Sequence, residues 1–322
     1  MTKNVEVLAL CKHRPIAVIG AGLVGAGWAV VFARAGLTVK MYDTNIETTH
    51  TAMRLIKEQL SSLSDHGLID EDPGTVAARI TPVPTLNEAI AGAIYAQESV
   101  LERVEVKRGL IRDLDACAPQ DMVVGSSTSG IPASEFSLGL PISPRVLTVH
   151  PVNPPYLIPV VELVPSTQTS IESIEFATSL MNALGQTVVH VRKEVEGFVL
   201  NRLQAVLLRE AWALVQEGVV SCEDVDKTVR DGLGWRWSFM GPFETIDLNA
   251  PQGVADYAER LGPLYQRIAQ SRQHDSPWDA GLIENVASQL RQHLPLSELE
   301  ERRAWRDQRL MEIASARRTK QQ

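Results

Sequence analysis

The sequence predicts an α/β protein in which a doubly wound, mainly parallel sheet domain precedes an all-helical domain. Three observations support this fold class. A glycine-rich turn joins an apolar run to a helix-like segment near the start of the chain. Short apolar runs then alternate with helix-like segments, which is typical of a parallel sheet covered on both faces. Near residue 193 the strand-like runs stop and helical periodicity takes over. We therefore expect a sheet domain in residues 1–193 and a helical domain in residues 194–322.

The first part of the expected sheet domain is a strand, a glycine turn and a helix. Residues 16–19 are an apolar run typical of a buried strand, and residues 26–35 have helical periodicity. Between them, Gly20, Gly22 and Gly25 have the spacing G-x-G-x-x-G. In this pattern the first glycine permits a tight turn, the second lets a pyrophosphate approach the backbone, and the third allows close helix–strand packing. Because free amides at a helix start favour negative charge, the pattern predicts a dinucleotide site in a Rossmann-type domain.

An acidic residue follows the second expected strand, residues 37–42. Asp43 lies about twenty residues beyond the glycines, where a carboxylate accepts hydrogen bonds from the adenosine ribose hydroxyls. The same carboxylate repels a 2′-phosphate, and no arginine follows it to bind one. The sequence therefore predicts NAD rather than NADP as the cofactor.

The alternation of helices and strands continues beyond Asp43. A long helix capped by Asn45 is expected next, and further helices are expected over residues 102–118 and 170–184. The strand-like segments between and after them read "ARITPV", "AIYAQES", "DMVVGSS", "RVLTVH", "IPVVELV" and "TVVHVRK". The last segment of the chain is a basic, helix-like tail, which we expect to be solvated and to which no function is assigned.

Composition excludes several classes of protein. The 322 residues are 44% hydrophobic and 22% charged, as in ordinary globular proteins, and the net charge of −8 argues against a nucleic-acid partner. No apolar run approaches the roughly twenty residues of a membrane span, and no signal peptide is recognisable. Three scattered cysteines are too few for a disulfide framework or a zinc cluster, so we expect reduced, buried thiols and no metal.

One histidine and one glutamate stand close together in an otherwise apolar, proline-rich stretch. His150 ends a strand-like run, and Pro151, Pro154 and Pro155 then force an irregular excursion. Glu162 lies in the apolar strand that follows. A buried carboxylate needs a partner, and His150 is the nearest group able to carry positive charge. The pattern predicts a His150–Glu162 pair, which is either structural or the general base of an active site with its orienting carboxylate.

Two other polar features have both a structural and a functional interpretation. Residues 126–129 read Ser-Ser-Thr-Ser and follow an expected strand, where ligands bind in open α/β sheets, although such clusters are also typical of turns. Asn201 shares an apolar helix face with Leu208 and Trp212, so its amide needs a partner in either a neighbouring loop or a substrate.

Arg236 stands between two tryptophans in "LGWRWSFMGP". Its side chain either stacks and extends along the protein surface or clamps a substrate carboxylate with two parallel hydrogen bonds.

Taken together, these stretches resemble the 3-hydroxyacyl-CoA dehydrogenase superfamily. The similarity extends from the glycine turn to "LNAPQG" and is densest in "HPVNPPYLIPVVELVP", "KEVEGFVLNRLQ" and "GLGWRWSFMGPFETIDLN". The resemblance implies an NAD-dependent dehydrogenase, with a helical domain that serves substrate binding and dimerisation. It also implies a cytoplasmic homodimer.

The resemblance assigns roles to individual residues. The family's catalytic histidine falls on His150 and its orienting glutamate on Glu162. The serine that polarises the substrate falls on Ser129, and the catalytic asparagine on Asn201. Besides the three glycines, the implied cofactor contacts are Leu23, Val24, Asp43, Glu102 and Lys107, and the expected substrate contacts are Ser129, Asn153, Asn201 and Arg236.

Two departures from the family pattern bear on the substrate. Many acyl-CoA members read "SNTS" and "HFFNP", whereas this chain reads "SSTS" and "HPVNPP". The segment after Asp43 offers only Arg54, Lys57 and His66 as cations, which is sparse for the phosphates of CoA. We therefore expect oxidation of the 3-hydroxyl of a small polar hydroxy acid such as L-gulonate. The alternatives are L-carnitine, a 3-hydroxyacyl-CoA such as 3-hydroxybutyryl-CoA, and a non-catalytic, structural protein that binds NAD(H).

Overall fold

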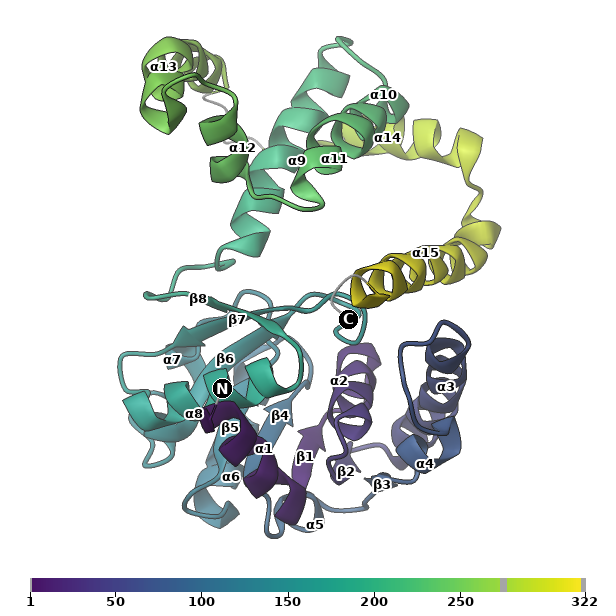
Figure 1. The fold of residues 1–322 in the computed structure, drawn as a ribbon, viewed down its shortest axis with the longest axis vertical. Coiled ribbons are helices and arrows are strands. Elements are labelled where there is room, and N and C mark those ends of the chain that lie inside the picture. Colours follow the sequence, from purple (N-terminus) through teal and green to yellow (C-terminus); the bar gives the residue numbers. More distant parts are fainter. Residues whose placement is uncertain (1, 273–276, 320–322) are drawn as a thin grey trace. The chain divides into compact units, whose positions relative to one another are not determined.

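The computed structural model describes residues 2–272 and 277–319, and the chain forms two compact units (Figure 1). The sheet unit contains the residues up to Arg202 together with those from Ala304 onward, and the helical unit is Leu203–Arg303. The predicted domain boundary at residues 193 and 194 stays a prediction, because contacts within one chain do not show which segment folds independently.

An eight-stranded sheet forms the centre of the first unit, in the order β3-β2-β1-β4-β5-β6-β7-β8. The β6–β7 pair is antiparallel and every other neighbouring pair is parallel, which confirms the prediction of a mainly parallel sheet. The order of strands reverses between β1 and β4, which is where dinucleotides bind in doubly wound sheets. The strands are β1 (Ile16–Ile19), β2 (Val39–Tyr42), β3 (Ile80–Pro82), β4 (Tyr95–Glu98), β5 (Val123–Ser126), β6 (Val146–Pro151), β7 (Val160–Pro165) and β8 (Thr187–His190).

Helices cover both faces of this sheet. Successive residues of a strand point to opposite faces, and in β1 they join two separate cores: Ile16 and Val18 pack in one, Ala17 and Ile19 in the other. On the first face α1 packs against α8 (Figure 1). The helices of the unit are α1 (Thr2–His13), α2 (Leu23–Arg34), α3 (Ile46–Asp65), α4 (Pro73–Ala77), α5 (Leu86–Ile90), α6 (Val104–Cys117), α7 (Ser134–Ser137), the 3₁₀ turn η1 (Ser143–Arg145) and α8 (Ile171–Ala183).

Three local predictions need correction. The helix after the glycine turn begins at Leu23, one turn earlier than predicted, with Gly22 as its N-cap. The N-terminal helix α1 was not predicted. Of the three free cysteines, Cys11 is buried, whereas Cys117 is exposed and Cys222 half-buried, so the expectation of buried thiols holds for one of them.

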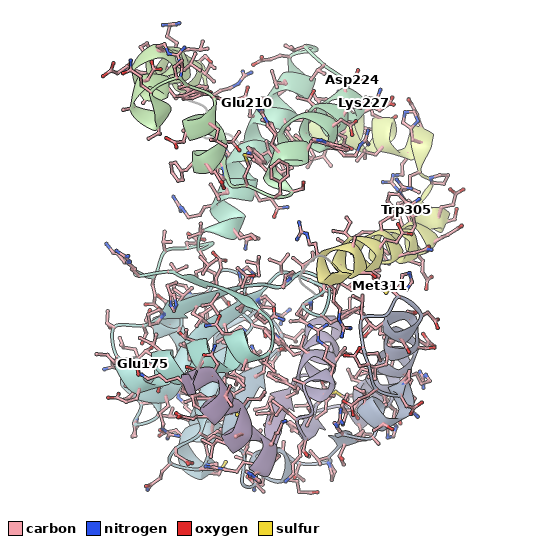
Figure 2. The ribbon with its side chains drawn as sticks, in the orientation of Figure 1. Glu175, Glu210, Asp224, Lys227, Trp305 and Met311 are labelled. Atoms are coloured by element: carbon pink, nitrogen blue, oxygen red, sulfur yellow. The ribbon has the colours of Figure 1, made fainter. Side chains whose placement is uncertain are left out.

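The basic C-terminal tail is a helix, α15 (Leu299–Thr319), but it is not fully solvated as expected. Met311, labelled in Figure 2, is 8% exposed and belongs to the core that contains β1 and α2. Arg318 donates a 2.8 Å hydrogen bond to the carbonyl of Gly67 and pairs with Asp70. The few apolar side chains of this strongly charged helix are therefore enough to pack α15 against the sheet unit.

The helical unit holds few buried side chains. Val215, Leu282 and Val286 form a small core, and Trp212 stacks on Trp278 with 4.2 Å between ring centroids. Ion pairs supplement it: Arg272 binds Glu210 and Glu217, and Lys227 binds Asp224 (Figure 2). The elements here are α9 (Leu200–Gln216), α10 (Cys222–Lys227), the π-helical η2 (Thr228–Leu233), α11 (Gly234–Trp237), α12 (Pro242–Leu248), α13 (Gly253–Ser271), α14 (Ala280–His293) and η3 (Leu296–Glu298). Within the residues that the structure describes, no helix is long and apolar enough to cross a membrane.

Candidate active site

The glycine turn has the geometry of a pyrophosphate site. Gly20 has φ +96°, and a Cβ atom there would overlap the carbonyl of Ser99. A Cβ on Gly25 would overlap the carbonyl of Gly20, whereas a Cβ on Gly22 would meet nothing within 4 Å. The turn and the packing therefore need Gly20 and Gly25, and the space at Gly22 is open for a ligand to approach the backbone. Leu23, with 70% of its surface exposed, begins α2 at this opening, followed by the half-buried Val24.

Asp43 lies at the end of β2, beside the turn. Its Oδ2 accepts a 2.9 Å hydrogen bond from the amide of Ala21, and its Oδ1 accepts a 3.0 Å bond from the amide of Asn45. Each oxygen keeps a lone pair for a further donor. Asp43 thus fixes the turn to the start of α3 while its carboxylate still fits a ribose diol. Contact with the ribose stays a prediction.

His150 and Glu162 are directly opposed in the antiparallel β6–β7 ladder. His150 Nδ1 lies 2.8 Å from Glu162 Oε2, and the two side chains are 7% and 2% exposed. An ionised carboxylate only accepts, so Nδ1 carries the proton in this bond and Nε2 of the neutral ring keeps a free lone pair. The predicted pairing is therefore present, with the ring nitrogen Nε2 available as a base.

The second oxygen of Glu162 binds the start of a helix. Oε1 accepts hydrogen bonds of 2.9 and 3.0 Å from the amides of Val199 and Leu200, at the N-terminus of α9. Burial acts to raise the pKa of Glu162, but the hydrogen bond from His150 and those from Leu200 and Val199 outweigh it, so the pKa is lowered. The carboxylate is thereby held ionised, as a residue that stabilises an imidazolium must be.

Phe198 shapes the backbone that reaches Glu162. It is fully buried and has φ +50°, a left-handed conformation that is uncommon for an aromatic residue. Its ring centroid lies 5.6 Å from that of His150. The strained residue thus packs against the imidazole while directing the next two amides to the carboxylate.

Ser129, Glu102 and Asn201 come together at the end of β5. Glu102 Oε1 accepts from Thr128 Oγ1 at 2.7 Å, from the amide of Ser129 at 2.8 Å and from Ser129 Oγ at 3.2 Å. Asn201 Nδ2 donates to the carbonyl of Ser129 at 2.6 Å. Glu102 therefore fixes the loop that carries Ser129, and the backbone of that loop accepts from one of the two N–H groups of Asn201.

Lys107 is buried behind this loop and bridges two carboxylates. Its ammonium lies 2.9 Å from Glu98 Oε1 and 3.2 Å from Glu102 Oε2. Glu98 is fully buried and also binds the hydroxyl of Ser126. Glu98 was not predicted as part of the site, although an acidic residue in the apolar segment "AIYAQES" indicates a carboxylate that needs a partner. The predicted contact of Lys107 with the cofactor stays a prediction, because its ammonium is occupied by Glu98 and Glu102.

The two remaining predicted substrate contacts are Asn153 and Arg236. Asn153 is exposed on the excursion between β6 and β7, three residues after His150. Arg236 is exposed on α11, in the helical unit. Their roles stay predictions.

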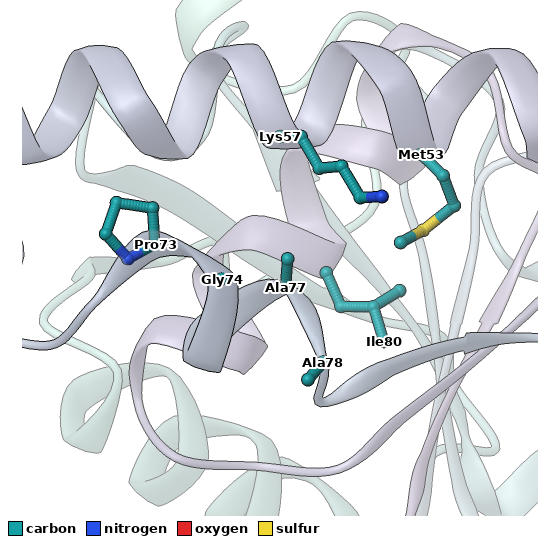
Figure 3. A pocket seen from close by; sticks show the side chains of 7 residues that line it. All are labelled: Met53, Lys57, Pro73, Gly74, Ala77, Ala78 and Ile80. Atoms are coloured by element: carbon teal, nitrogen blue, oxygen red, sulfur yellow. The ribbon is translucent and has the colours of Figure 1, made fainter.

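A separate cavity of about 570 Å³ lies between α3, α4 and β3 (Figure 3). Its only charged lining residue is Lys57, whose side chain points toward Met53. Its lining residues include no histidine and no carboxylate, so the cavity has nothing like the His150–Glu162 pair.

A glycine turn of the dinucleotide-binding kind, a carboxylate just after the second strand and a histidine held by a glutamate are the parts expected of an NAD-dependent dehydrogenase. The model of the 3-hydroxyacyl-CoA dehydrogenase NAD binding domain matches residues 15–195, and that of the C-terminal domain matches residues 197–287. The chain belongs to the 3-hydroxyacyl-CoA dehydrogenase family, and it is an NAD-dependent hydroxy-acid dehydrogenase.

Similar proteins cover nearly the whole chain. Lambda-crystallin of Oryctolagus cuniculus is 37% identical over 313 residues, which are 95% of this chain and 97% of the relative. An L-carnitine dehydrogenase of Streptomyces coelicolor is 35% identical over 82% of this chain and 80% of its own length. Among solved structures, the NAD+-dependent dismutase 5-formyl-3-hydroxy-2-methylpyridine 4-carboxylic acid 5-dehydrogenase superposes with a TM-score of 0.80 at 26% identity, covering 95% of this chain and 98% of that one.

Proposed function

We propose that the protein oxidises the 3-hydroxyl of a small polar hydroxy acid of the L-gulonate type to the corresponding ketone. The observation that supports this chemistry best is the 2.8 Å hydrogen bond between His150 and Glu162, because it leaves Nε2 as a positioned base. A protein that only binds NAD(H) has no need of this arrangement.

The protein's own residues handle the proton. His150 Nε2 removes the hydroxyl proton of the substrate, and the resulting imidazolium is stabilised by the ionised Glu162. When bound, NAD would supply the acceptor for the hydride that leaves the carbon bearing this hydroxyl. The alcohol loses one proton to His150 and one hydride to NAD, so the products are a ketone, NADH and a protonated imidazole.

Neighbouring polar groups hold the substrate. We assign Ser129 and Asn201 to the reacting oxygen, since both lie in the cluster at the end of β5. The 3.2 Å bond from Ser129 Oγ is the longer of the two hydroxyl contacts to Glu102, so this hydroxyl is the easier one to redirect to a ligand. We assign Arg236 to the carboxylate on the chemistry of its exposed guanidinium, with Asn153 as a further polar contact.

The sparse cations after β2 favour a small acid over a CoA thioester. Arg54 donates to Thr51 Oγ1 at 3.2 Å, and His66 Nδ1 is bonded to the carbonyl of Ser62 at 2.8 Å. Lys57 lines the separate cavity. CoA presents a 3′-phosphate and a pyrophosphate, which need several free cations.

A substrate panel tests the proposal. L-gulonate, L-carnitine, 3-hydroxybutyrate and 3-hydroxybutyryl-CoA are each assayed with NAD and with NADP by NADH or NADPH absorbance. We expect the highest kcat/KM with L-gulonate and NAD. A higher kcat/KM with L-carnitine, the substrate named for one relative, or with the CoA thioester would make that compound the proposed substrate instead. No turnover of any of the four compounds would favour a protein that binds NAD(H) without catalysis.

We further propose a cytoplasmic homodimer formed through the helical unit. Large apolar side chains are exposed on this unit in the single chain, which is typical of a protein interface. They include Val206 (71%), Trp235 (72%), Phe239 (71%), Phe243 (80%) and Leu248 (67%).

A further inference from the structure

A polar network beside the glycine turn is not used in the proposed mechanism. Its members are Trp28 of α2, Tyr95 and Gln97 of β4, Ser99 just after β4, and Ser127 just after β5. Trp28, Tyr95 and Gln97 are fully buried, while both serines are half-buried. Because the donors and acceptors in such a closed network are limited, the direction of each hydrogen bond follows from its partners.

The orientation of the Gln97 amide is fixed first. The hydroxyl of Tyr95 donates to Gln97 Oε1 at 2.6 Å, and burial raises the pKa of Tyr95 well above its ordinary value, so the phenol keeps this proton. Gly125 makes the contact possible, because a Cβ there would overlap the phenol oxygen. Gln97 Nε2 then faces Ser127 Oγ at 2.8 Å and the carbonyl of Val149 at 3.4 Å. The flipped amide would place two oxygens against each other and leave the phenol proton without an acceptor.

Ser127 therefore receives two donors. The indole Nε1 of Trp28, which can only donate, lies 3.1 Å from Ser127 Oγ, and Gln97 Nε2 lies 2.8 Å from it. These bonds use both lone pairs of the hydroxyl. Its own proton is left for Ser99 Oγ, 2.8 Å away. The bond between the two serines thus runs from Ser127 to Ser99.

Ser99 is left with a proton to donate, and it lies at the cofactor crevice. Its oxygen accepts from Ser127, and no acceptor for its own proton is present among residues 2–272 and 277–319. Its amide donates to the carbonyl of Ile19 at 2.7 Å, and its backbone abuts Gly20 so closely that a Cβ on that glycine would overlap it. Ser99 follows β4 at the reversal of strand order between β1 and β4, where dinucleotides bind.

We propose that Ser99 is a further cofactor-binding residue whose hydroxyl donates a hydrogen bond to an acceptor oxygen in the pyrophosphate–ribose part of NAD. Trp28, Gln97 and Ser127 are positioning residues that hold this hydroxyl as a donor before the cofactor binds. The role depends on the cofactor and not on which hydroxy acid is oxidised, so it stands or falls separately from the substrate proposed above.

Binding measurements without substrate test the role. Dissociation constants of NADH, ADP-ribose, ADP and AMP are measured by calorimetry for the wild type and for Ser99→Ala. We expect a two- to tenfold loss (roughly) of NADH and ADP-ribose affinity, the size of one hydrogen bond, and no change for AMP. If Ser99→Ala already weakens ADP binding, the acceptor is a pyrophosphate oxygen. If affinity is lost for ADP-ribose but not for ADP, the acceptor is in the ribose.

Two further variants separate binding from folding. Ser99→Thr keeps the hydroxyl and should restore the NADH affinity lost in Ser99→Ala. Ser62→Ala is the matched control: Ser62 is also half-buried, but it bonds the carbonyl of Glu58 near the end of α3 and should leave all four constants unchanged. Unchanged NADH affinity in Ser99→Ala, an equal loss for AMP, or no restoration by threonine would each overturn the proposal.

Discussion

The sheet unit and the helical unit differ in how completely a single chain buries them. In the sheet unit large and even charged side chains are fully enclosed, such as Trp28, Phe32 and the ion pair of Lys107 with Glu98. In the described part of the helical unit, the buried apolar side chains are Val215, Leu282 and Val286, while Phe243 and Trp235 are 80% and 72% exposed. The first unit is complete within one chain, and the second has an apolar surface that lacks a cover.

This difference indicates that the sheet unit serves the reaction and the helical unit serves association between chains. A reaction that depends on a fixed imidazole and a fixed cofactor turn needs a rigid surrounding, which the sheet unit supplies by itself. An apolar surface that faces water is stabilised by association, because burying it removes apolar area from solvent. We therefore expect changes in the sheet unit to alter chemistry and changes on the helical unit to alter assembly.

The largest effect should follow from His150→Ala. Loss of a positioned general base should lower kcat by about 10²–10⁴-fold, with the dissociation constant of NADH little changed, because the cofactor turn is intact. Steady-state kinetics and NADH titration measure the two quantities. His66→Ala, which removes a half-buried imidazole at the end of α3, is the control and should keep its turnover. A near-normal kcat in His150→Ala would show that His150 is not the general base.

A charge on the apolar surface should break assembly instead. Phe243→Glu is expected to weaken the proposed dimer by about 30- to 1,000-fold, the range for an aromatic residue at the centre of an interface, while NADH affinity stays unchanged. Sedimentation equilibrium measures the dimer constant. Gln266→Glu places the same charge on an exposed position of α13 and serves as the control. A wild-type protein that is monomeric at all concentrations would show that the apolar surface of the helical unit does not form a dimer.

The pH dependence of stability tests how Glu162 is held. Its pKa is lowered in the folded protein, so its stabilisation is complete above the unfolded pKa of about 4.3 and is lost as the pH falls through the folded value. We expect Glu162→Gln to lower the free energy of unfolding by about 1–3 kcal/mol at neutral pH. Urea unfolding of both proteins should show that this difference in the free energy of unfolding shrinks as the pH falls below about 4.3. A gap that is constant with pH would mean that the charge of Glu162 contributes nothing.

The smallest effect should follow from Lys57→Ala. Lys57 is exposed and lines the cavity between α3 and β3, away from the catalytic set, so kcat/KM for the hydroxy acid should change by less than about twofold. The same assay with 3-hydroxybutyryl-CoA tests whether Lys57 contributes to binding of a CoA thioester. A large fall with the thioester alone would make this cavity part of a CoA site.

The predictions from sequence succeeded where the physical constraint was local. The spacing of Gly20, Gly22 and Gly25 predicted the turn because each position has its own steric requirement. Glu162 indicated its partner because an ionised group in an apolar strand cannot stay unpaired, and His150 was the closest candidate. The mainly parallel sheet followed from the alternation of helices and strands.

Contacts set by strand order could not be predicted in the same way. Trp28 and Ser127 are separated by 99 residues and meet only because the sheet brings the residue after β5 to the helix that follows the glycine turn. Lys107 finds Glu98 inside the sheet unit rather than at the protein surface, which its sequence neighbours do not indicate. The helix α1 has weak apolar periodicity and no acidic residue in its first turn, so neither of the usual signals marks it.

The return of α15 makes the helical unit an insertion within the sheet unit. The chain passes from one unit to the other after Arg202 and comes back before Ala304, so two covalent tethers join them. A protease that cuts only at the first tether leaves a C-terminal fragment whose last helix is still anchored through Met311. Truncated or circularly permuted forms of this enzyme must therefore keep α15 with the cofactor-binding half, even though the two are separated in the sequence by the whole helical unit.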